Sequence, residues 1–367
     1  MIFGGPSPEH DVSVLTGLQA ARALSKAGSV PVAVYWDKTG KFWQVDPELE
    51  AEAFLDGAPR GATPLRLGAA HDGGGFSAGK GGLLGKERLV ALDALVNCCH
   101  GGPGEDGSLQ AALDLARVRY TGPSAAGAAL GMDKLAFAGV VAAAGLPSLP
   151  RVPVTPSMPE PSFPGPYILK PRFGGSSIGI EVVERWADAQ ALVSLGAINW
   201  RRGALAEPYR SAAADINVAV RAYPKAELSL LERPTRTGGG DILGYRDKYL
   251  GGEGMASAPR ELPAVLAPEM AQALRAAAFT VVDLAAVRGV ARIDFLVDGD
   301  EWWVNEINTI PGSLARYLWV GEAKLEFSVL LADMLAEATR VPGFHWDPSP
   351  ADGLALRSAS SIASKLG

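Results

Sequence analysis

The sequence predicts an α/β protein of two or three domains, and three observations support this prediction. The chain has 367 residues, which exceeds the usual length of one domain. Apolar segments typical of strands alternate along the chain with segments that have helical periodicity. Hydrophobic residues make up 48% and charged residues 20% of the chain, the balance of a folded protein with a sizeable core.

Composition excludes several functional classes. A net charge of −6 and a pI near 5.4 argue against nucleic acid as a partner. The best apolar run, from Ala136 to Leu146, is too short to cross a membrane, and the N-terminal MIFGGPSPEH has no signal-peptide pattern. The two cysteines, Cys98 and Cys99, are adjacent, which fits buried strand residues better than a metal or redox motif. We therefore expect a cytoplasmic enzyme.

The first unit is expected to contain strands and helices in alternation. Its first strand, Met1 to Phe3, is so short that we expect the natural start to lie elsewhere. Ser7 is predicted to cap a helix, and the Gly-rich segment 58–85 is predicted to be an irregular loop. The other expected elements are a helix over Val12 to Leu24, strands over Val30 to Trp36 and Leu89 to Cys99, and a helix over Ser108 to Arg117.

Two further units follow, separated by a proline-rich connection. The expected elements of the second are a helix over Asp133 to Ala144, a strand over Tyr167 to Lys170 and a Gly/Ser loop over Gly174 to Gly179. Those of the third are a strand over Asp215 to Val220 and helices over Pro268 to Arg288 and Lys324 to Thr339. The tail beyond Pro342 is rich in Pro, Ser, Ala and Gly and is expected to be partly flexible.

The most informative segment, RIDFLVDGDEWWVNEINTIPG (292–312), is predicted to form a β-hairpin with an acidic face. Folding it about Asp300 places Asp294 opposite Glu306 and Arg292 opposite Asn308, all on one side of the sheet. Two opposed carboxylates repel unless a cation lies between them. With an amide oxygen they make a hard donor set that suits Mg²⁺ and a substrate's phosphates. The alternative is a surface hairpin with a chance acidic pair.

Two loops could also contact ligands. Lys170 ends a strand just before Gly174 to Gly179, whose backbone N–H groups and hydroxyls can hold phosphate oxygens. The lysine precedes the glycines, so this is no Walker A loop, and an ordinary flexible turn is the alternative. His100 is expected either to contact a ligand or to lock its loop by hydrogen bonds, and Glu105 and Asp106 are expected to stabilise the start of the next helix.

Seven motifs, taken in order, resemble those of D-alanine–D-alanine ligases of the ATP-grasp superfamily. They are GGPSPEHDVS, HGGPGEDGSLQ, GMDK, ILKPRFGGSSIGI, YRDKY, ARIDF and NEINTIPG, spread from Gly4 to Gly312. The resemblance implies a three-domain ATP-grasp architecture with an N-terminal Rossmann-like domain. The expected ranges are 1–123 on the donor side, 124–212 with the phosphate loop, 213–341 with the Mg²⁺ site, and the tail 342–367.

The resemblance also implies roles for individual residues. It implies that ATP is bound by Lys134, Lys170, Ser176, Ser177, Glu207, Asp215 and Lys248. It implies that two Mg²⁺ ions, with Mn²⁺ as an alternative, are held by Asp294, Glu306 and Asn308. It assigns catalysis to Arg292, Gly312, Glu9, Tyr249 and Ser176. It assigns binding of the amino acid substrates to Glu9, Val12, His100, Arg316 and Tyr317.

The implied reaction is ATP-dependent joining of two amino acids in peptidoglycan precursor synthesis. The donor carboxylate becomes an acyl phosphate, and Arg292 with the Gly312 N–H stabilises the oxyanion formed when the acceptor amine attacks it. Lys248 and Tyr249 belong to a loop that closes over the site, and the YRDKY motif favours an amine acceptor over a hydroxy acid. The resemblance also implies a homodimer.

The chain departs from the family pattern after NEINTIPG. There the family has small hydroxyl residues that hold the acceptor's carboxylate, whereas here Tyr317 stands at the serine position and Arg316 is expected to supply the binding instead. Asp215 is also one residue out of register with the family's ribose-binding glutamate. Three functions stay open: a D-alanine–D-alanine ligase, a dipeptide ligase of specialised metabolism with a non-alanine acceptor, and an ATP-binding pseudoenzyme.

Overall fold

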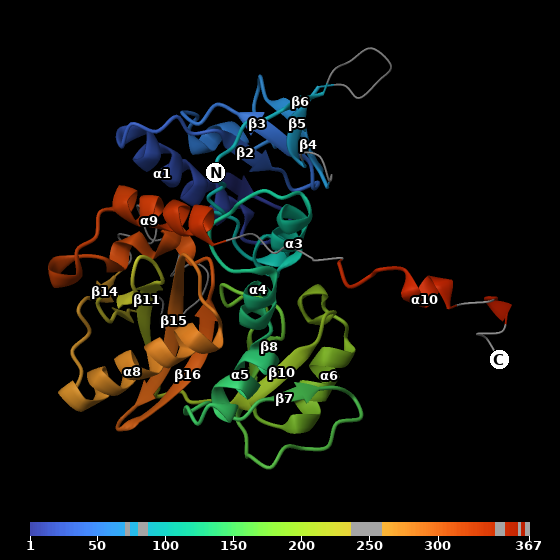
Figure 1. Cartoon of the computed structure of the whole chain (residues 1–367). Helices are drawn as coiled ribbons and strands as arrows, with labels where there is room; N and C mark the ends of the chain where they lie inside the picture. The colour runs from blue at the N-terminus through green and yellow to red at the C-terminus, as the bar shows by residue number, and fades with distance from the viewer. Residues whose placement is uncertain (70–73, 80–86, 236–258, 342–348, 359–360, 364–367) are drawn as a thin grey trace.

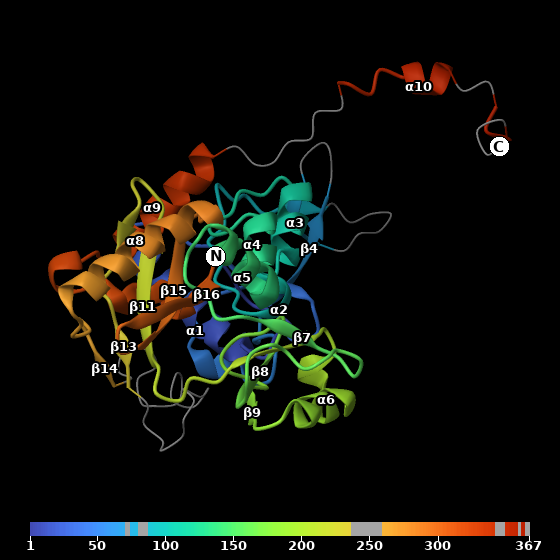
Figure 2. The same cartoon turned by 90° about the horizontal axis from the view of Figure 1, so that it is seen from below.

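Three main sheets, which follow one another along the chain, and a small two-stranded sheet form the body of the protein in the part that the computed structural model describes (Figure 1). The structure describes the whole chain except residues 70–73, 80–86, 236–258, 342–348, 359–360 and 364–367. Helix α4 (Ala125–Met132) lies next to the N-terminal unit, and α5 (Lys134–Ala143) lies between the C-terminal and middle sheets, as the views in Figures 1 and 2 show. No helix among the described residues is long and apolar enough to span a membrane.

The N-terminal sheet combines a parallel pair with an antiparallel extension. β1 (Ile2–Gly4) pairs in parallel with β2 (Ala33–Trp36). The antiparallel strands that continue the sheet are β3 (Phe42–Val45), β4 (Thr63–Gly68), β5 (Gly75–Ala78) and β6 (Arg88–Leu89). The prediction of an irregular loop over 58–85 is therefore wrong where β4 and β5 form, because the pairing of β4 with β3 and of β5 with β4 overrides the low strand propensity of glycine.

The predicted strand Leu89 to Cys99 forms only in part. Leu89 lies in β6, and isolated parallel bridges join Asn97 to Ile2 and Leu95 to Tyr120. The segment thus runs beside β1 and delivers His100 to the carboxyl edge of the sheet, as expected. The remaining elements of this unit are η1 (Ala51–Phe54), α2 (Gly102–Glu105) and α3 (Ser108–Leu115).

Helix α1 (His10–Lys26) contains the predicted helical segment, but Glu9 rather than Ser7 holds the N-cap position. Ser7 lies two residues before the N-cap. Its Oγ accepts a hydrogen bond from the Glu9 N–H at 2.9 Å and donates one to the His100 carbonyl at 2.7 Å. Glu9 is thereby fixed where helix α1 meets the His100 loop.

The middle sheet is antiparallel, in the order β7 (Val152–Val154), β10 (Ala204–Pro208), β8 (Tyr167–Pro171) and β9 (Glu181–Val183). Helix α6 (Trp186–Ser194) and the short η2 (Ile198–Trp200) accompany it. Tyr167, Leu169 and Trp186 form its core. The predicted helix and strand of this unit are confirmed as α5 and β8, and Asp133 caps α5 by accepting the N–H groups of Leu135 and Ala136.

The C-terminal sheet is also antiparallel, in the order β12 (Glu227–Leu228), β11 (Ala214–Arg221), β15 (Val290–Asp298) and β16 (Glu301–Asn308). Helix α8 (Pro268–Leu284) covers one face of it, where Phe295 and Ile293 are fully buried. The other elements are β13 (Arg233–Pro234), β14 (Arg260–Glu261), η3 (Gly312–Leu318), η4 (Gly321–Ala323), α9 (Phe327–Arg340) and α10 (Leu354–Arg357). Figure 1 shows α10 apart from the body.

One hydrophobic core joins the two ends of the chain. Val14 and Leu18 of α1 pack in the same cluster as Leu314 of η3 and Leu330 of α9. Burying a side chain of this size contributes roughly 1.5–3 kcal/mol. The N-terminal unit and the segment after β16 are therefore held together by packing as well as by the polar contacts described below.

Candidate active site

The predicted face of the hairpin is confirmed. Asp294 of β15 lies opposite Glu306 of β16, and Arg292 lies opposite Asn308. The Nδ2 of Asn308 donates to Asp294 Oδ2 at 3.0 Å, so these side chains meet on the same side of the sheet.

The pairing arises from a bulge that the sequence did not reveal. At the turn Asp298 already pairs with Glu301, so the connection contains only Gly299 and Asp300. Near the site the register shifts, because Phe295 pairs with Val304 and one residue of β16 is left over. That residue is Asn305.

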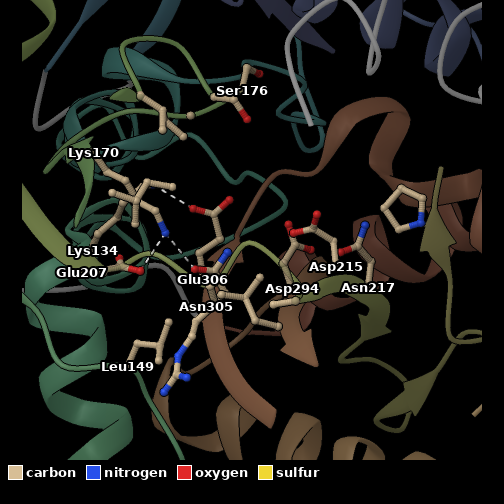
Figure 3. Close-up of a pocket in the computed structure, with 18 of the residues that line it drawn as sticks. Lys134, Leu149, Lys170, Ser176, Glu207, Asp215, Asn217, Asp294, Asn305 and Glu306 are labelled. Atoms are coloured by element: carbon tan, nitrogen blue, oxygen red, sulfur yellow. Dashed lines mark hydrogen bonds and ion pairs between the residues drawn. The ribbon is translucent and has the colours of Figure 1, made fainter. Parts of the chain in front are cut away.

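The bulge directs two consecutive side chains, Asn305 and Glu306, into one pocket between the middle and C-terminal sheets. In Figure 3 they lie between the two lysines on one side and Asp294, Asp215 and Asn217 on the other. Residues lining the pocket from the sequence prediction are Lys134, Lys170, Ser176, Ser177, Glu207, Asp215, Arg292, Asp294 and Glu306.

Both lysines reach the pocket from separate elements and contact its acids. Lys134, at the start of α5, forms an ion pair with Glu306 at 2.9 Å and donates to the Gly174 carbonyl at 2.7 Å. Lys170, at the end of β8, pairs with Glu207 at 2.9 Å and donates to Asn305 Oδ1 at 3.2 Å. Two ammonium groups thus lie against the acidic hairpin, a charge pattern that suits phosphates.

Glu207 is fully buried between two cations. Besides Lys170, Arg151 contacts it through Nε at 2.8 Å, and the Arg151 Nη2 donates to the carbonyl of Asn305 at 2.5 Å. Burial alone would raise the pKa of Glu207, but the charges of Arg151 and Lys170 outweigh it and hold the pKa below its ordinary value. Glu207 therefore stays ionised and fixes Lys170 at the pocket wall.

The Gly/Ser loop after β8 bends over the pocket and contacts the N-terminal unit. Ser176 and Ser177 have φ angles of 53° and 58°, and the Ser176 hydroxyl donates a hydrogen bond to Glu9 Oε1. A Cβ at Gly175 would lie 3.0 Å from Glu9 Oε2, so a bulkier residue there would push the loop away. Glu9 and the phosphate-loop candidate, far apart in sequence, therefore meet.

Arg292 is buried and held by a two-pronged ion pair. Its Nε and Nη2 each donate to Asp294 at 2.7 Å, and its Nη1 donates to the Tyr317 hydroxyl at 3.3 Å. Burial would lower the pKa of Arg292, but the charge of Asp294 raises it well above its ordinary value. Burial raises the pKa of Tyr317 to about 12, so its hydroxyl is neutral.

Three residues beside Tyr317 escaped the sequence prediction. Arg260 lies over the Tyr317 ring at 4.5 Å and contacts Glu232 at 2.6 Å, and Asn217, directly across from Asp294, donates to Glu232 at 3.2 Å. Burial raises the pKa of Glu232 despite Arg260. Asn217 lies two residues after Asp215 in the predicted strand, so the alternation of side chains along β11 could have revealed it. No motif marks the other two.

Side chains of the N-terminal unit bind the segment after β16. His100 Nδ1 contacts the Ile310 carbonyl and its Nε2 contacts Thr16 Oγ1, each at 2.7 Å. Protein groups occupy both ring nitrogens, which corresponds to the loop-locking alternative. Glu105 accepts the N–H of Ile310 and that of Gly101, each at 2.9 Å.

The hydrogen bonds of Glu105 among the described residues go to Gly101, at the N-cap of α2, and to Thr309 and Ile310, so the prediction that it stabilises the start of the following helix, α3, is wrong. Its carboxylate lies against the segment after β16 because the loop folds back on itself, which sequence spacing does not reveal. Asp106 does behave as predicted: its Oδ1 accepts the Ser108 N–H at 3.1 Å at the start of α3.

The turn that contains Gly312 has an unusual backbone. Ser313, Leu314 and Ala315 have φ angles of 50°, 49° and 53°, so three consecutive non-glycine residues are left-handed. Such residues cost roughly 1–2 kcal/mol each. Burial of Leu314 and Ala315 offsets this strain.

Among the described residues, those predicted for the site but absent from the pocket lining are Glu9, Val12, His100, Asn308, Gly312, Arg316 and Tyr317. Arg316 donates to Gln19 at 3.3 Å and lies 5.8 Å from the Phe327 ring centre, outside the pocket lining. Val12 is buried in α1 and does not line the pocket either. Lys248 and Tyr249 lie outside the described residues.

The acidic hairpin fits a magnesium ion by its donor chemistry. Asp294 and Glu306 offer carboxylate oxygens and Asn308 an amide oxygen, the hard ligands that Mg²⁺ prefers. Among the described residues no three or more His, Cys, Asp and Glu side chains cluster, so this set contains only two carboxylates. Protein cations also balance them, since Arg292 pairs with Asp294 and Lys134 with Glu306.

Comparison with known proteins agrees with this geometry. A family model described as the D-ala D-ala ligase N-terminus matches residues 1–123, and one described as the D-ala D-ala ligase C-terminus matches residues 158–336. The D-alanine–D-alanine ligase of Campylobacter concisus is 30% identical over 87% of this chain and 88% of its own length. That of Methylobacterium sp. (strain 4-46) is 33% identical over 86% of this chain and 83% of its own length.

Solved structures share the fold. The D-alanine–D-alanine ligase from Helicobacter pylori superposes with a TM-score of 0.70 at 24% identity, and covers 92% of this chain and 98% of its own. The VanG D-Ala:D-Ser ligase from Enterococcus faecalis superposes with a TM-score of 0.72 at 23% identity, with the same coverage.

A pocket between two antiparallel sheets, lined by two lysines and an acidic hairpin, defines an ATP-grasp enzyme. The similarity over nearly the whole chain then specifies the family within that superfamily. The chain belongs to the D-alanine–D-alanine ligase family.

Proposed function

We propose that this protein joins two amino acids through a peptide bond, with D-alanine as the donor. One observation carries the proposal: Glu9, a candidate for binding the donor's ammonium group, meets the Ser176 loop at the edge of a pocket that also contains both lysines and the acidic hairpin. The donor amino acid and the phosphates of ATP can therefore be bound side by side.

The first step requires two anions to react. A donor carboxylate oxygen attacks the γ-phosphorus of ATP, the bond from phosphorus to the bridging oxygen breaks, and ADP leaves with that electron pair. Lys134 and Lys170 supply positive charge that lowers the repulsion, and Glu207 with Arg151 holds Lys170 in position. Mg²⁺ ions held by Asp294, Glu306 and Asn308 would neutralise phosphate charge when bound.

The second step forms the peptide bond. The acceptor's neutral amine attacks the carbonyl carbon of the acyl phosphate, the bond from that carbon to the phosphate oxygen breaks, and inorganic phosphate leaves with the electron pair and takes up the proton that the nitrogen loses. Arg292 is proposed to stabilise the developing oxyanion together with the Gly312 N–H. Its pairing with Asp294 keeps the guanidinium charged and oriented in a buried setting.

The acceptor is proposed to be read by Tyr317 and Arg260 rather than by Arg316. The Tyr317 hydroxyl lies next to Arg292, so it occupies the side of the site from which an acceptor would approach. Arg260, which pairs with Glu232, lies over that ring and lines the pocket, so its guanidinium is proposed to bind the acceptor's carboxylate as well. Arg260→Lys should therefore raise the KM for the acceptor more than the KM for ATP. Equal changes in the two KM values would show that another group binds the acceptor's carboxylate.

Tyr317 favours a second candidate within the same reaction, a dipeptide ligase whose acceptor is not D-alanine. A tyrosine ring fills volume that a serine leaves open. The fold does not fix the acceptor, since it is shared with a D-Ala:D-Ser ligase.

A panel of D- and L-amino acids separates these functions. Phosphate release from ATP should require an amino acid, and mass spectrometry of the products should identify the dipeptide. D-alanyl-D-alanine as the sole product supports the cell-wall ligase, and a mixed dipeptide supports the second candidate. ATP binding without amino-acid-dependent turnover would leave only a pseudoenzyme.

We propose domain boundaries after residues 123, 212 and 341, supported by the placement of each main sheet within one of these ranges. Dependence on Mg²⁺, a homodimer and a cytoplasmic location stay predictions, to be checked by metal titration, sedimentation and cell fractionation.

A further inference from the structure

Side chains of the N-terminal unit form hydrogen bonds with the backbone of the segment that follows the acidic hairpin. The N–H of Ile310 donates to Glu105 at 2.9 Å, while the carbonyl of the same residue contacts His100 at 2.7 Å. Three residues on, the N–H of Ser313 donates to Thr16 Oγ1 at 3.1 Å. The backbone is thus fixed on both sides of Pro311 and Gly312.

These hydrogen bonds define the proton positions in the network. The Ile310 carbonyl can only accept, so His100 Nδ1 carries a proton and Nε2 accepts the hydroxyl proton of Thr16. The Thr16 oxygen is then free to accept the Ser313 N–H. These hydrogen bonds require a neutral His100 ring. Burial lowers the pKa of His100 to about 4, so the ring is neutral at pH 7.

The backbone amides of this turn differ in what they bind. Ile310 and Ser313 donate to Glu105 and Thr16, and Leu314 donates to the Pro311 carbonyl at 2.8 Å. Pro311 has no N–H. In the part of the chain that the structure describes, no hydrogen bond from the Gly312 N–H is found. That amide remains for a ligand oxygen.

The turn also has a reason to need external support. Ser313, Leu314 and Ala315 are left-handed, a conformation that non-glycine residues rarely adopt in succession. A strained turn persists only where its surroundings determine it. Here the surroundings are the Thr16 hydrogen bond and the shared core of α1, η3 and α9.

We propose that Thr16, His100 and Glu105 are positioning residues that hold the Gly312 amide in place for ligation. They act through the backbone of Ile310 and Ser313, and Thr16 lies outside the lining of the nucleotide pocket. Helix α1 therefore sets the rate of bond formation as well as contributing Glu9. This inference rests on the proposed oxyanion role of Gly312.

Thr16→Val tests the network directly, since it removes the hydroxyl and keeps the shape. The kcat for amino-acid-dependent phosphate release should fall by roughly 10- to 100-fold, because misplacing a reacting group by about 1 Å costs that much. The KM for ATP should change less than about twofold if only the amide has moved. Thr16→Ser keeps the hydroxyl and should restore most of the kcat.

Thr280→Val is the matched control. Thr280 of α8 bonds its own helix through the Ala276 carbonyl, so the same chemical change there should leave both constants unaltered. Unchanged kcat in Thr16→Val, or an equal loss in Thr16→Ser, would overturn the proposal. Should Thr16→Val not fold, Glu105→Gln replaces it, because it weakens the grip on Ile310; a kcat equal to that of the unmodified protein would again contradict the proposal.

A second measurement does not depend on activity. Hydrogen exchange, followed by mass spectrometry of peptides that cover residues 308–318, should be faster in Thr16→Val than in the unmodified protein and in Thr16→Ser. Faster exchange with no ligase activity in any of the proteins would refute the proposed function and support the backbone contacts. Unchanged exchange would refute the positioning role, whatever the activity.

Discussion

Replacing Arg292 by lysine separates its charge from its shape. The guanidinium makes two bonds of 2.7 Å to Asp294 and one of 3.3 Å to Tyr317, and it is buried. A lysine keeps one positive charge but has no planar fork, so it cannot hold both carboxylate oxygens and an oxyanion at once. We expect folding to be retained, since Asp294 keeps a cationic partner.

The size of the effect follows from the one hydrogen bond to the oxyanion that lysine cannot make. A hydrogen bond to a charged group contributes roughly 1.5–3 kcal/mol. If this bond is absent only in the transition state, kcat and kcat/KM should both fall by about 10- to 100-fold, since about 1.4 kcal/mol corresponds to a factor of ten.

The assay is steady-state phosphate release with ATP and both amino acids varied. Arg185→Lys serves as the control, because Arg185 makes a similar two-pronged pair with Asp188 on the exposed surface of α6. The control should leave kcat unchanged. A pure rise in the KM for ATP in Arg292→Lys, with kcat intact, would refute the assigned role.

Three further predictions concern other parts of the site. Glu306→Gln should lower kcat by well over tenfold, roughly 1.4 kcal/mol or more, whereas Glu301→Gln, at the exposed start of the same strand, should not; wild-type turnover at ordinary Mg²⁺ would reject the metal assignment. Tyr317→Ser should shift the acceptor profile with little change in ATP affinity; if the unmodified enzyme already uses D-alanine as its sole efficient acceptor, the idea fails. Glu105→Gln should make the stability of the fold more sensitive to acid. Burial lowers the pKa of His100 to about 4, so the free energy of unfolding that its neutral ring contributes is lost as pH falls from 6.5 toward 4. Glu105 has the opposite effect in the unmodified protein. Burial raises its pKa to about 7, so its contribution to the free energy of unfolding falls as pH rises from 4.5 toward 7 and grows again as pH falls. The drop in Tm from pH 7 to pH 5 should therefore be larger in the variant than in the unmodified protein, and an equal drop would contradict the assignment.

The local sequence pattern predicted the hairpin, but it did not predict the turn and the bulge that set its strand pairing. Alternation correctly placed Asp294 opposite Glu306, although a two-residue turn and the bulge at Asn305 produce that pairing. The bulge depends on contacts from distant segments, among them Arg151 and Lys170, which bond to Asn305. Sequence spacing within the hairpin contains no such information.

Residues that act across long distances in the chain were harder to predict. Arg260 and Glu232 belong to no motif and meet Tyr317 only because β13, β14 and η3 come together in the fold. The left-handed turn after Gly312 was equally hidden, since Ser313 to Ala315 have no local preference for it. Strand β4 and strand β5 were missed because their pairing outweighs the propensity of a glycine-rich segment.

The proposed reaction requires that phosphate transfer from ATP activates the donor carboxylate before the peptide bond forms. D-alanine labelled with ¹⁸O in both carboxylate oxygens tests it in a single experiment with the unmodified protein, ATP, Mg²⁺ and an acceptor. Attack of the carboxylate on the γ-phosphorus leaves one labelled oxygen on the released phosphate, and the other remains in the new peptide carbonyl. We therefore expect one ¹⁸O in each phosphate formed with dipeptide. Unlabelled phosphate, or AMP and pyrophosphate in place of ADP and phosphate, would contradict this mechanism.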